Sequence, residues 1–151
     1  MGRHGGPDLI AVDTNILVYA YREEAEQHHR AVGALFDLAT GNEPWGLPVF
    51  VMGEFLRVLT HPSILRPPSK PARVIQALES IMASPTVHVL LPGDRFWTLL
   101  RDTVTTGAAH GNQVQDAEIV AVCREHGVDT ILTEDRDLLR FPSIRVRTLT
   151  G

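Results

Sequence analysis

Two short hydrophobic runs of this chain end in side chains that can bind a cation. The run Leu9–Val12 is followed by Asp13–Asn15, and the run Thr130–Leu132 is followed by Thr133–Asp137, which holds three acidic residues. Runs of this length and composition predict buried strands of a parallel sheet. Ligands of open α/β sheets bind outside the carboxyl ends of the strands. We therefore expect these acidic side chains to share one crevice and to hold a divalent cation there.

Glu54 is a third acidic position with an unusual setting. It lies on a helix predicted over residues 49–61, close to Val51 and Val58, which belong to the apolar stripe of that helix. A lone carboxylate is rare beside a buried stripe unless it is paired or bound to a metal. The ordinary alternative is an edge position from which Glu54 reaches water, paired with Arg57.

The remaining acidic residues each have a purely structural alternative. Asp116 begins a helix predicted over 116–126, where aspartate is a preferred N-cap, and Asp13 suits the same role after the first strand. Asp135 and Asp137 suit a turn. Four unrelated caps and turns seldom produce this combination, so we interpret four residues together as catalytic, metal-binding carboxylates: Asp13, Glu54, Asp116 and Asp135.

Such a carboxylate set implies one kind of chemistry. Mg²⁺ and Mn²⁺ prefer carboxylate and water oxygens as ligands. A bound ion lowers the pKa of a coordinated water and neutralises charge that develops on a phosphoryl group. No nucleophilic side chain is then required, and we expect hydrolysis of a phosphodiester by a metal-activated water.

The elements that position these residues alternate along the chain. Strands are predicted over 9–12, 87–91, 130–133 and 144–149, helices over 16–21, 26–40, 49–61, 72–83, 96–105 and 116–126, and a connection with room for a short strand over 41–48. This alternation predicts an α/β fold with a parallel sheet of about four to five strands flanked by helices on both faces. We expect one domain over residues 9–149, preceded by a flexible lead-in over residues 1–8.

Charge and composition permit a nucleic-acid substrate without requiring one. The net charge of −4 argues against a general polyanion binder, although bound cations would offset the acidic cluster locally. Lys70 is the single lysine, and the other 13 cationic side chains are arginines. Arginine is the better bidentate partner for phosphate.

The remaining composition favours a cytoplasmic protein. The single cysteine, Cys123, excludes an internal disulfide framework and is interpreted as a small core residue. The seven histidines follow no metal-ligand spacing. No apolar run approaches the ~18 residues that span a membrane, and the first residues lack the hydrophobic segment of a signal peptide.

The segments around the carboxylates resemble the four signatures of PIN-domain nucleases. These segments are Ile10–Leu17, Gly53–Phe55, Gln115–Ala117 and Thr133–Asp137. The surrounding stretches Phe55–Pro62 and Arg124–Val128 are similar to the VapC toxins within that family. The resemblance covers residues 9–149, nearly the whole chain.

The resemblance implies a Mg²⁺- or Mn²⁺-dependent endoribonuclease that cleaves structured RNA such as tRNA or rRNA. It also implies the toxin of a type II toxin–antitoxin pair, a homodimer, and a cognate VapB-type antitoxin that covers the site. Asn15 and Thr133 would orient carboxylates or water. Asp137 matches the last acidic position of the fourth signature, and its reach to the metal is left open. Candidates for RNA contacts are Arg57, Asn112 and Arg136.

Two alternatives belong to other functional classes. An aspartate-nucleophile phosphatase also places an aspartate after its first strand, but it needs a lysine at the site. Lys70 lies in a proline-rich loop, and Asn15 stands where the second aspartate of a phosphatase would be. The other alternative is a catalytically inactive RNA-binding module, which the complete acidic set disfavours.

Overall fold

Five parallel strands form the centre of the computed structural model, which describes residues 9–65 and 67–151. They are β1 (Ile10–Val12), β2 (Trp45–Pro48), β3 (Val87–Leu90), β4 (Thr130–Leu132) and β5 (Arg145–Arg147). Their order in the sheet is β3-β2-β1-β4-β5. The predicted parallel sheet is confirmed, and the possible strand within residues 41–48 is β2. The lead-in predicted over residues 1–8 lies outside the described residues.

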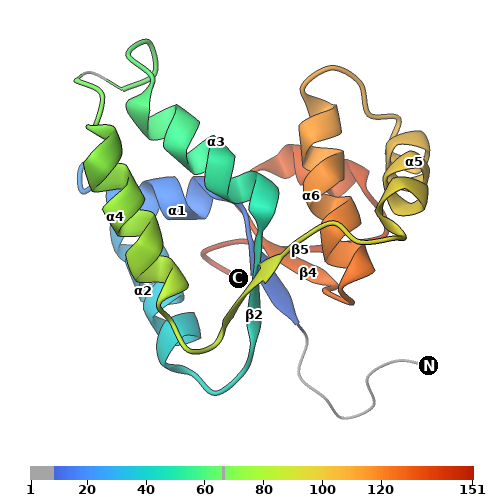
Figure 1. Cartoon of the computed structure of the whole chain (residues 1–151), viewed down its shortest axis with the longest axis horizontal. Coiled ribbons are helices and arrows are strands. Elements are labelled where there is room, and N and C mark those ends of the chain that lie inside the picture. Colours follow the sequence, from blue (N-terminus) through green and yellow to red (C-terminus); the bar gives the residue numbers. More distant parts are fainter. Residues whose placement is uncertain (1–8, 66) are drawn as a thin grey trace.

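The helices cover both faces of this sheet. They are α1 (Thr14–Tyr21), α2 (His28–Thr40), α3 (Val49–Thr60), α4 (Pro71–Met82), α5 (Phe96–Gly107), α6 (Gln113–Glu125) and the 3-10 helix η1 (Arg136–Arg140). The chain moves outward from β1 to β2 and β3 through α1–α4, then returns past β1 to β4 through α5 and α6. Because crossovers between parallel strands are right-handed, this reversal places the two helix groups on opposite sides (Figure 1).

The reversal of direction lies between β1 and β4. These two strands are neighbours, and Val12 is paired with Leu132 at their carboxyl ends. The residues that follow, Asp13 and Thr133, are therefore brought side by side. Ligands of open α/β sheets bind in the crevice at this kind of switch point, so the topology itself selects the carboxyl ends of β1 and β4.

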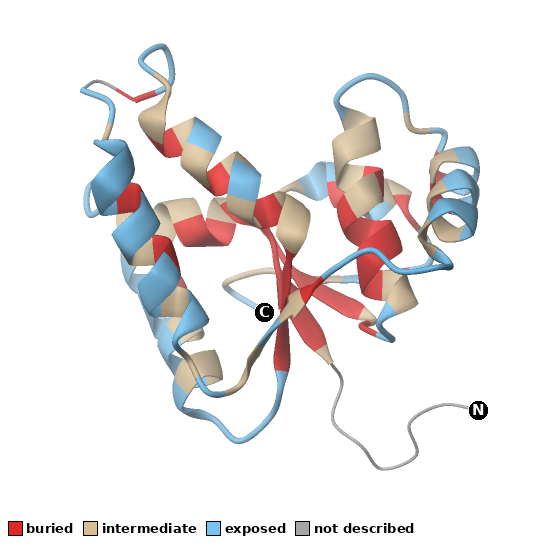
Figure 2. Cartoon of the chain, viewed as in Figure 1, coloured by how far each residue is buried: buried red, intermediate tan, exposed pale blue. Residues whose placement is uncertain are grey.

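The core runs through β1 and α6. The three residues of β1 are all buried, and α6 is buried from Ile119 to Cys123, which Figure 2 shows as continuous red on strand and helix. A helix that is apolar on more than one side requires partners on more than one side. Here α6 lies between the sheet and α5 (Figure 1). Cys123 is fully buried, which confirms its prediction as a core residue.

The start of α6 differs from the sequence prediction. The helix begins at Gln113, one turn earlier than predicted, so that Asp116 lies inside the first turn and Asn112 is the N-cap residue. The prediction failed because Gln113 Oε1 accepts a hydrogen bond from the His110 backbone N–H (3.2 Å), a local contact that hydrophobic periodicity does not reveal. The N-cap explanation of Asp116 is therefore wrong.

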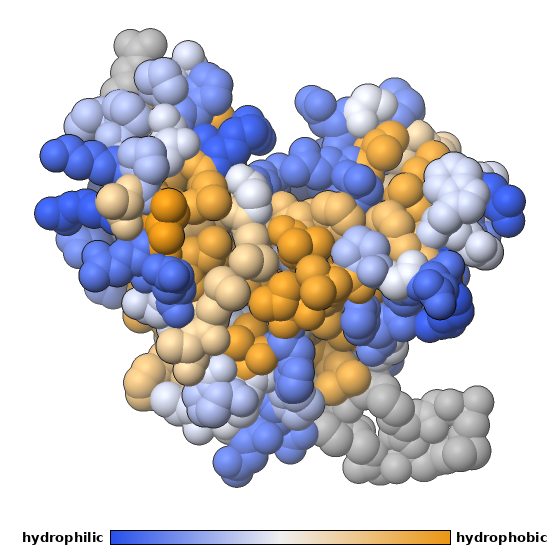
Figure 3. Space-filling model, in the orientation of Figure 1, coloured by the Kyte–Doolittle hydropathy of each residue, from blue (hydrophilic) through white to orange (hydrophobic). Residues whose placement is uncertain are grey.

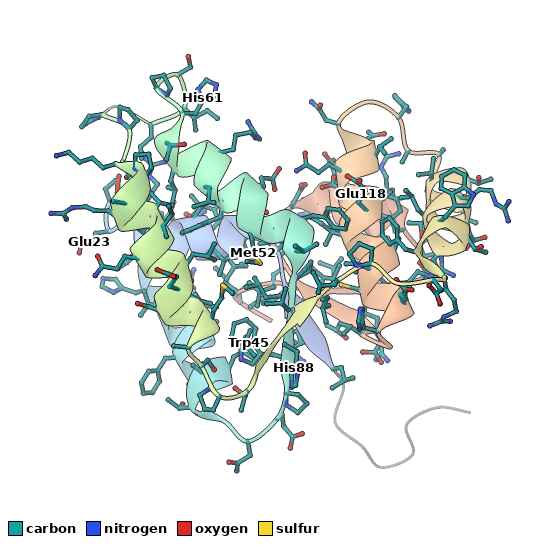
Figure 4. All side chains as sticks on the ribbon, in the orientation of Figure 1. Glu23, Trp45, Met52, His61, His88 and Glu118 are labelled. Atoms are coloured by element: carbon teal, nitrogen blue, oxygen red, sulfur yellow. The ribbon has the colours of Figure 1, made fainter. Side chains whose placement is uncertain are left out.

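The aromatic and imidazole side chains separate into distinct environments. Trp45 is buried in the core, whereas Trp97 is 65% exposed and lies outside the core. Figure 4 shows His61 beyond the carboxyl end of α3 and His88 at the opposite end of the molecule.

Within residues 9–65 and 67–151, none of the helices combines the length and apolar character that crossing a bilayer requires.

Candidate metal centre

Asp13 lies at the junction where β1 runs into α1. It is the N-cap of α1, and its Oδ1 accepts a hydrogen bond from the Thr14 N–H (2.7 Å). Its Oδ2 accepts from Thr133 Oγ1 (2.8 Å) and from Asn15 Nδ2 (3.3 Å). Only 3% of Asp13 is exposed. Capping and participation in a site are thus compatible at this residue, because one carboxylate serves the helix and faces its neighbours at the same time.

Asn15 and Thr133 connect Asp13 to the loop that follows β4. Asn15 Nδ2 donates to Thr133 Oγ1 (2.9 Å), while Asn15 Oδ1 accepts from the Glu134 backbone N–H (3.0 Å). Since a backbone N–H can only donate, this contact fixes which end of the Asn15 amide faces which partner. Thr133 Oγ1 also accepts from the Asp135 N–H (3.0 Å). These contacts suit the orienting role predicted for Asn15 and Thr133, which stays a prediction.

Three further carboxylates gather beside this network. Asp116, Asp135 and Asp137 each offer one oxygen, and these oxygens lie within 4.8 Å of one another. Asp135 is the N-cap of η1, and its Oδ1 accepts from the Asp137 N–H (2.9 Å). Asp137 therefore lies beside Asp116 and Asp135, and whether it reaches the metal stays open.

Glu54 completes the set from the opposite side. A cleft of about 320 Å³ is lined by Asp13, Glu54, Asp116 and Asp135. Figure 3 shows the surface hollowed between the part of the molecule that carries α3 and the part that carries α6. The Glu54 side chain is 22% exposed, and its Oε2 lies 3.8 Å from Arg57 Nη2. Glu54 is therefore paired with Arg57 and also faces the acidic cleft, and its role as a metal ligand stays a prediction.

The crowding of carboxylates changes their acidity. Burial raises the pKa of Asp116 to about 7, and the neighbouring charges of Asp13, Asp135, Glu54 and Asp137 add to this effect. Burial also raises the pKa of Asp13, although hydrogen bonds from Thr133 and Thr14 oppose the change. Protonation relieves the mutual repulsion of these groups, and a bound cation would relieve it in the same way.

The donor set fits a hard divalent cation. An ion with oxygen ligands at about 2.1 Å spans about 4.2 Å between opposite ligands. Three carboxylate oxygens within 4.8 Å of one another are close to that spacing. The group contains neither histidine nor cysteine, which favours Mg²⁺ or Mn²⁺ over zinc.

The three residues predicted to contact RNA lie in different places. Arg57 is beside Glu54, and 56% of its side chain is exposed. Asn112 and Arg136 are also exposed, at the start of α6 and of η1, and neither lines the cleft as far as the described residues show. Their contact with RNA stays a prediction.

Some residues of the site were not singled out from the sequence. Thr14 lines the cleft, and its buried Oγ1 has no hydrogen-bond partner among the described residues. Val18 and Val58 also line the cleft, and each follows another lining residue, Thr14 or Glu54, by four positions. Helical periodicity could have identified both valines. Glu134 was missed as well, because its carboxylate binds a residue far along the chain, the N–H of Leu149 (2.7 Å).

Comparison with known proteins shows which family this chain belongs to. The family model described as PIN domain matches residues 10–144. Ribonuclease VapC43 of Mycobacterium tuberculosis is 36% identical over 139 residues, which cover 92% of this chain and 94% of that protein. Ribonuclease VapC48 of the same organism is 32% identical over 135 residues, covering 89% and 93%.

Solved structures show the same fold at lower identity. Mycobacterium tuberculosis VapC20, described as a sarcin-ricin loop cleaving toxin, has a TM-score of 0.63 at 22% identity and covers 90% of this chain and 98% of its own. VapBC2 from Rickettsia felis, bound to a DNA fragment from its promoter, has a TM-score of 0.67 at 16% identity and covers 93% and 98%. The chain therefore belongs to the PIN domain family, within which its relatives are VapC ribonucleases.

Proposed function

We propose that this chain is the toxin of a VapBC-type toxin–antitoxin pair and a metal-dependent endoribonuclease. The observation that carries the proposal is the cleft in which Asp13, Glu54, Asp116 and Asp135 face one another, with Asp137 beside them. The ribonuclease names of relatives at 36% and 32% identity support the same activity.

Asp116 and Asp135, together with the neighbouring Asp137, would hold the ion, Mg²⁺ or Mn²⁺. Asp13 and Glu54, which line the same cleft, remain the other two metal-binding carboxylates predicted from the sequence. When bound, the ion would activate a water and stabilise negative charge on the phosphodiester. Asp13 is held at both oxygens by hydrogen bonds from Thr14, Thr133 and Asn15, so its orientation does not depend on the substrate. A preorganised carboxylate avoids the cost of reorganisation during the reaction.

Arg57 would contact the RNA backbone at the edge of the cleft. Its side chain is 56% exposed and lies next to Glu54 at 3.8 Å. A guanidinium matches the geometry of phosphate oxygens and would attract the polyanion to an otherwise acidic site. Arg57→Gln is expected to weaken RNA binding while leaving ion affinity unchanged.

We further propose that the substrate is a structured RNA such as tRNA or rRNA. The fold shared with VapC20 supports this class without naming one RNA. The test is to map cleavage ends in total RNA after brief expression, with Asp116→Ala as the matched inactive control. Discrete new ends that appear only with the unaltered protein would support the proposal, and identical ends with Asp116→Ala would contradict it.

Besides covering the site, as the family resemblance implies, the antitoxin would occupy an apolar groove between α2 and α4. This groove, about 480 Å³, is lined by residues that include Val32, Phe36 and Ile81. Val32 and Phe36 of this groove are 42% and 63% exposed, and contiguous exposed apolar residues mark interaction sites. Phe36→Asp is expected to abolish co-purification with a co-expressed cognate antitoxin and to leave Mn²⁺ affinity unchanged. Loss of both properties would contradict the assignment of this groove.

A homodimer and a cytoplasmic location complete the proposal. The candidate dimer contact is formed by Leu91, in the β3–α5 connection, and Trp97, on α5, which are both exposed apolar residues. Substitution of both residues by serine is expected to convert the dimer into a monomer, which a measurement of molecular mass in solution would detect.

The phosphatase alternative gains no support, because Lys70 is the exposed N-cap residue of α4 and does not line the cleft.

A further inference from the structure

Glu134 joins the proposed metal centre to the C-terminal segment of the chain. Its backbone N–H donates to Asn15 Oδ1 (3.0 Å), inside the network that holds Asp13. Its Oε2 accepts from the Leu149 backbone N–H (2.7 Å). The main chain of Glu134 therefore contacts the network that holds Asp13, while its side chain contacts the segment that follows β5.

The contact with Leu149 continues the pairing of β4 with β5. Parallel ladders take their bonds at every second residue. The Arg145 N–H donates to the Asp129 carbonyl (2.8 Å), and the Thr133 N–H donates to the Arg147 carbonyl (2.9 Å). Leu149 lies two residues beyond the end of β5, and its N–H donates to the Glu134 carboxylate. A side chain thus takes the place of a main-chain carbonyl where the chain leaves β4.

The loop that Glu134 begins carries two of the three grouped carboxylates. Asp135 and Asp137 lie near Asp116, and each of their charges raises the pKa of Asp116. Like charges push such a loop outward unless other contacts hold it. A hydrogen bond to a carboxylate is stronger than one between neutral groups, so the Glu134 contact with Leu149 opposes this repulsion.

We propose that Glu134 is a positioning residue of the metal centre. By binding the Leu149 N–H, its carboxylate fixes the loop that presents Asp135 and Asp137, and affinity for the ion depends on the docking of the C-terminal segment. The inference rests on the proposed function in taking these carboxylates as ion ligands.

The test is the affinity of the full-length protein for Mn²⁺, measured by calorimetric titration without RNA. Glu134→Ala is expected to weaken binding by about tenfold, the lower range for residues that support metal ligands. Glu134→Gln keeps an acceptor oxygen and is expected to restore most of the affinity. Glu134→Asp moves the acceptor away from Leu149 and gives a milder version should the alanine variant not fold.

A second pair of variants removes the donor. Leu149→Pro deletes the N–H and is expected to match Glu134→Ala, whereas Leu149→Ala keeps the N–H and is the matched control. The double variant of Glu134→Ala with Leu149→Pro should bind no more weakly than either single variant, because both remove one interaction.

The outcomes separate the two proposals. Unchanged Mn²⁺ affinity in Glu134→Ala, or additive losses in the double variant, would overturn the positioning role and leave the proposed function intact. Absence of Mn²⁺ binding to the unaltered protein would overturn the proposed function and this inference with it. A lowered melting temperature with normal Mn²⁺ affinity would show that Glu134 supports only the fold, which also overturns the inference.

Discussion

The two walls of the cleft are built in opposite ways. On the wall formed by the ends of β1 and β4, Asp13 accepts three hydrogen bonds and the loop after β4 is connected to it through Asn15 and Thr133. On the α3 wall, Glu54 has an ion pair with Arg57 at 3.8 Å. The first wall is fixed before any ligand arrives, while the second can adjust. From this difference we propose that the strand ends bind the ion and that α3 accommodates the substrate.

The largest expected loss of RNA cleavage follows from removing Asp13, on the fixed wall, or Asp116, the carboxylate beside it. Asp13→Ala and Asp116→Ala should each lower RNA cleavage by at least about 100-fold, since a charged partner of the reacting groups is lost. The two variants should differ in stability. Asp13→Ala leaves buried donors without an acceptor and should cost about 1–3 kcal/mol, whereas Asp116→Ala removes a repelled charge and should not destabilise the metal-free protein. Cleavage assays measure the loss of activity, and urea unfolding measures the stability of each variant. Equal losses of stability in Asp13→Ala and Asp116→Ala would contradict the expected difference between the two positions.

A smaller effect should distinguish the walls directly. Asn15→Ala removes three hydrogen-bond contacts of the network, and we expect Mn²⁺ affinity to fall by about tenfold. Glu54→Gln alters the adjustable wall and should change Mn²⁺ affinity by less than that while lowering cleavage. Calorimetric titration of both variants against the unaltered protein gives the answer. A larger loss of affinity in Glu54→Gln than in Asn15→Ala would reverse the roles of the two walls.

The pH dependence of stability should report on the same cluster. The pKa of Asp116 rises from 3.8 to about 7 on folding. A carboxyl group with a raised pKa contributes stability that is fully present below pH 3.8 and lost as pH rises through about 7. In EDTA, the free energy of unfolding should therefore fall between pH 4 and pH 8. Asp116→Asn should flatten much of this slope.

Added Mn²⁺ should reverse that trend, because the ion displaces protons from the carboxylates and binds more tightly as pH rises. Unfolding curves at several pH values, with EDTA or with saturating Mn²⁺, provide the measurement. A stability that is independent of pH in EDTA would show that the carboxylates do not repel one another in the folded protein.

The smallest expected effect concerns Thr14. Its buried Oγ1 has no hydrogen-bond partner among the described residues, and such a group costs about 1–3 kcal/mol when unsatisfied. Thr14→Val keeps the shape of the side chain and should leave the metal-free protein equally stable or more stable. Thermal unfolding in EDTA tests this, with Thr14→Ser as the control that keeps the hydroxyl. A marked loss of stability in Thr14→Val alone would show that the hydroxyl has a partner in the folded protein.

Most of the fold could be predicted from the sequence because its elements alternate clearly. The strands at 9–12, 87–91 and 130–133 are recognisable as apolar runs. Asp13 comes directly after the first run, and Asp135 follows closely after the third. Position along a parallel strand is enough to place a residue at the carboxyl edge of the sheet. Asp13 and Asp135 lie near each other because β1 and β4, the strands that they follow, are neighbours in the sheet.

The remaining details depend on contacts that sequence patterns do not encode. The early start of α6 depends on a side-chain contact between Gln113 and His110. The contact between Glu134 and Leu149 depends on the register of β4 against β5, which becomes known only when the sheet is assembled. Structural and functional explanations also proved compatible, since Asp13 and Asp135 are N-caps and face the cleft as well.

The central claim is that clustered carboxylates hold a divalent ion for cleavage of RNA. Its most direct test is cleavage of a structured RNA by purified protein in EDTA, followed by addition of Mn²⁺, with Asp116→Ala in parallel. We expect no cleavage in EDTA, recovery of cleavage when Mn²⁺ is in excess, and no recovery for Asp116→Ala. Cleavage that persists in EDTA, or that Asp116→Ala performs at the rate of the unaltered protein, would contradict it.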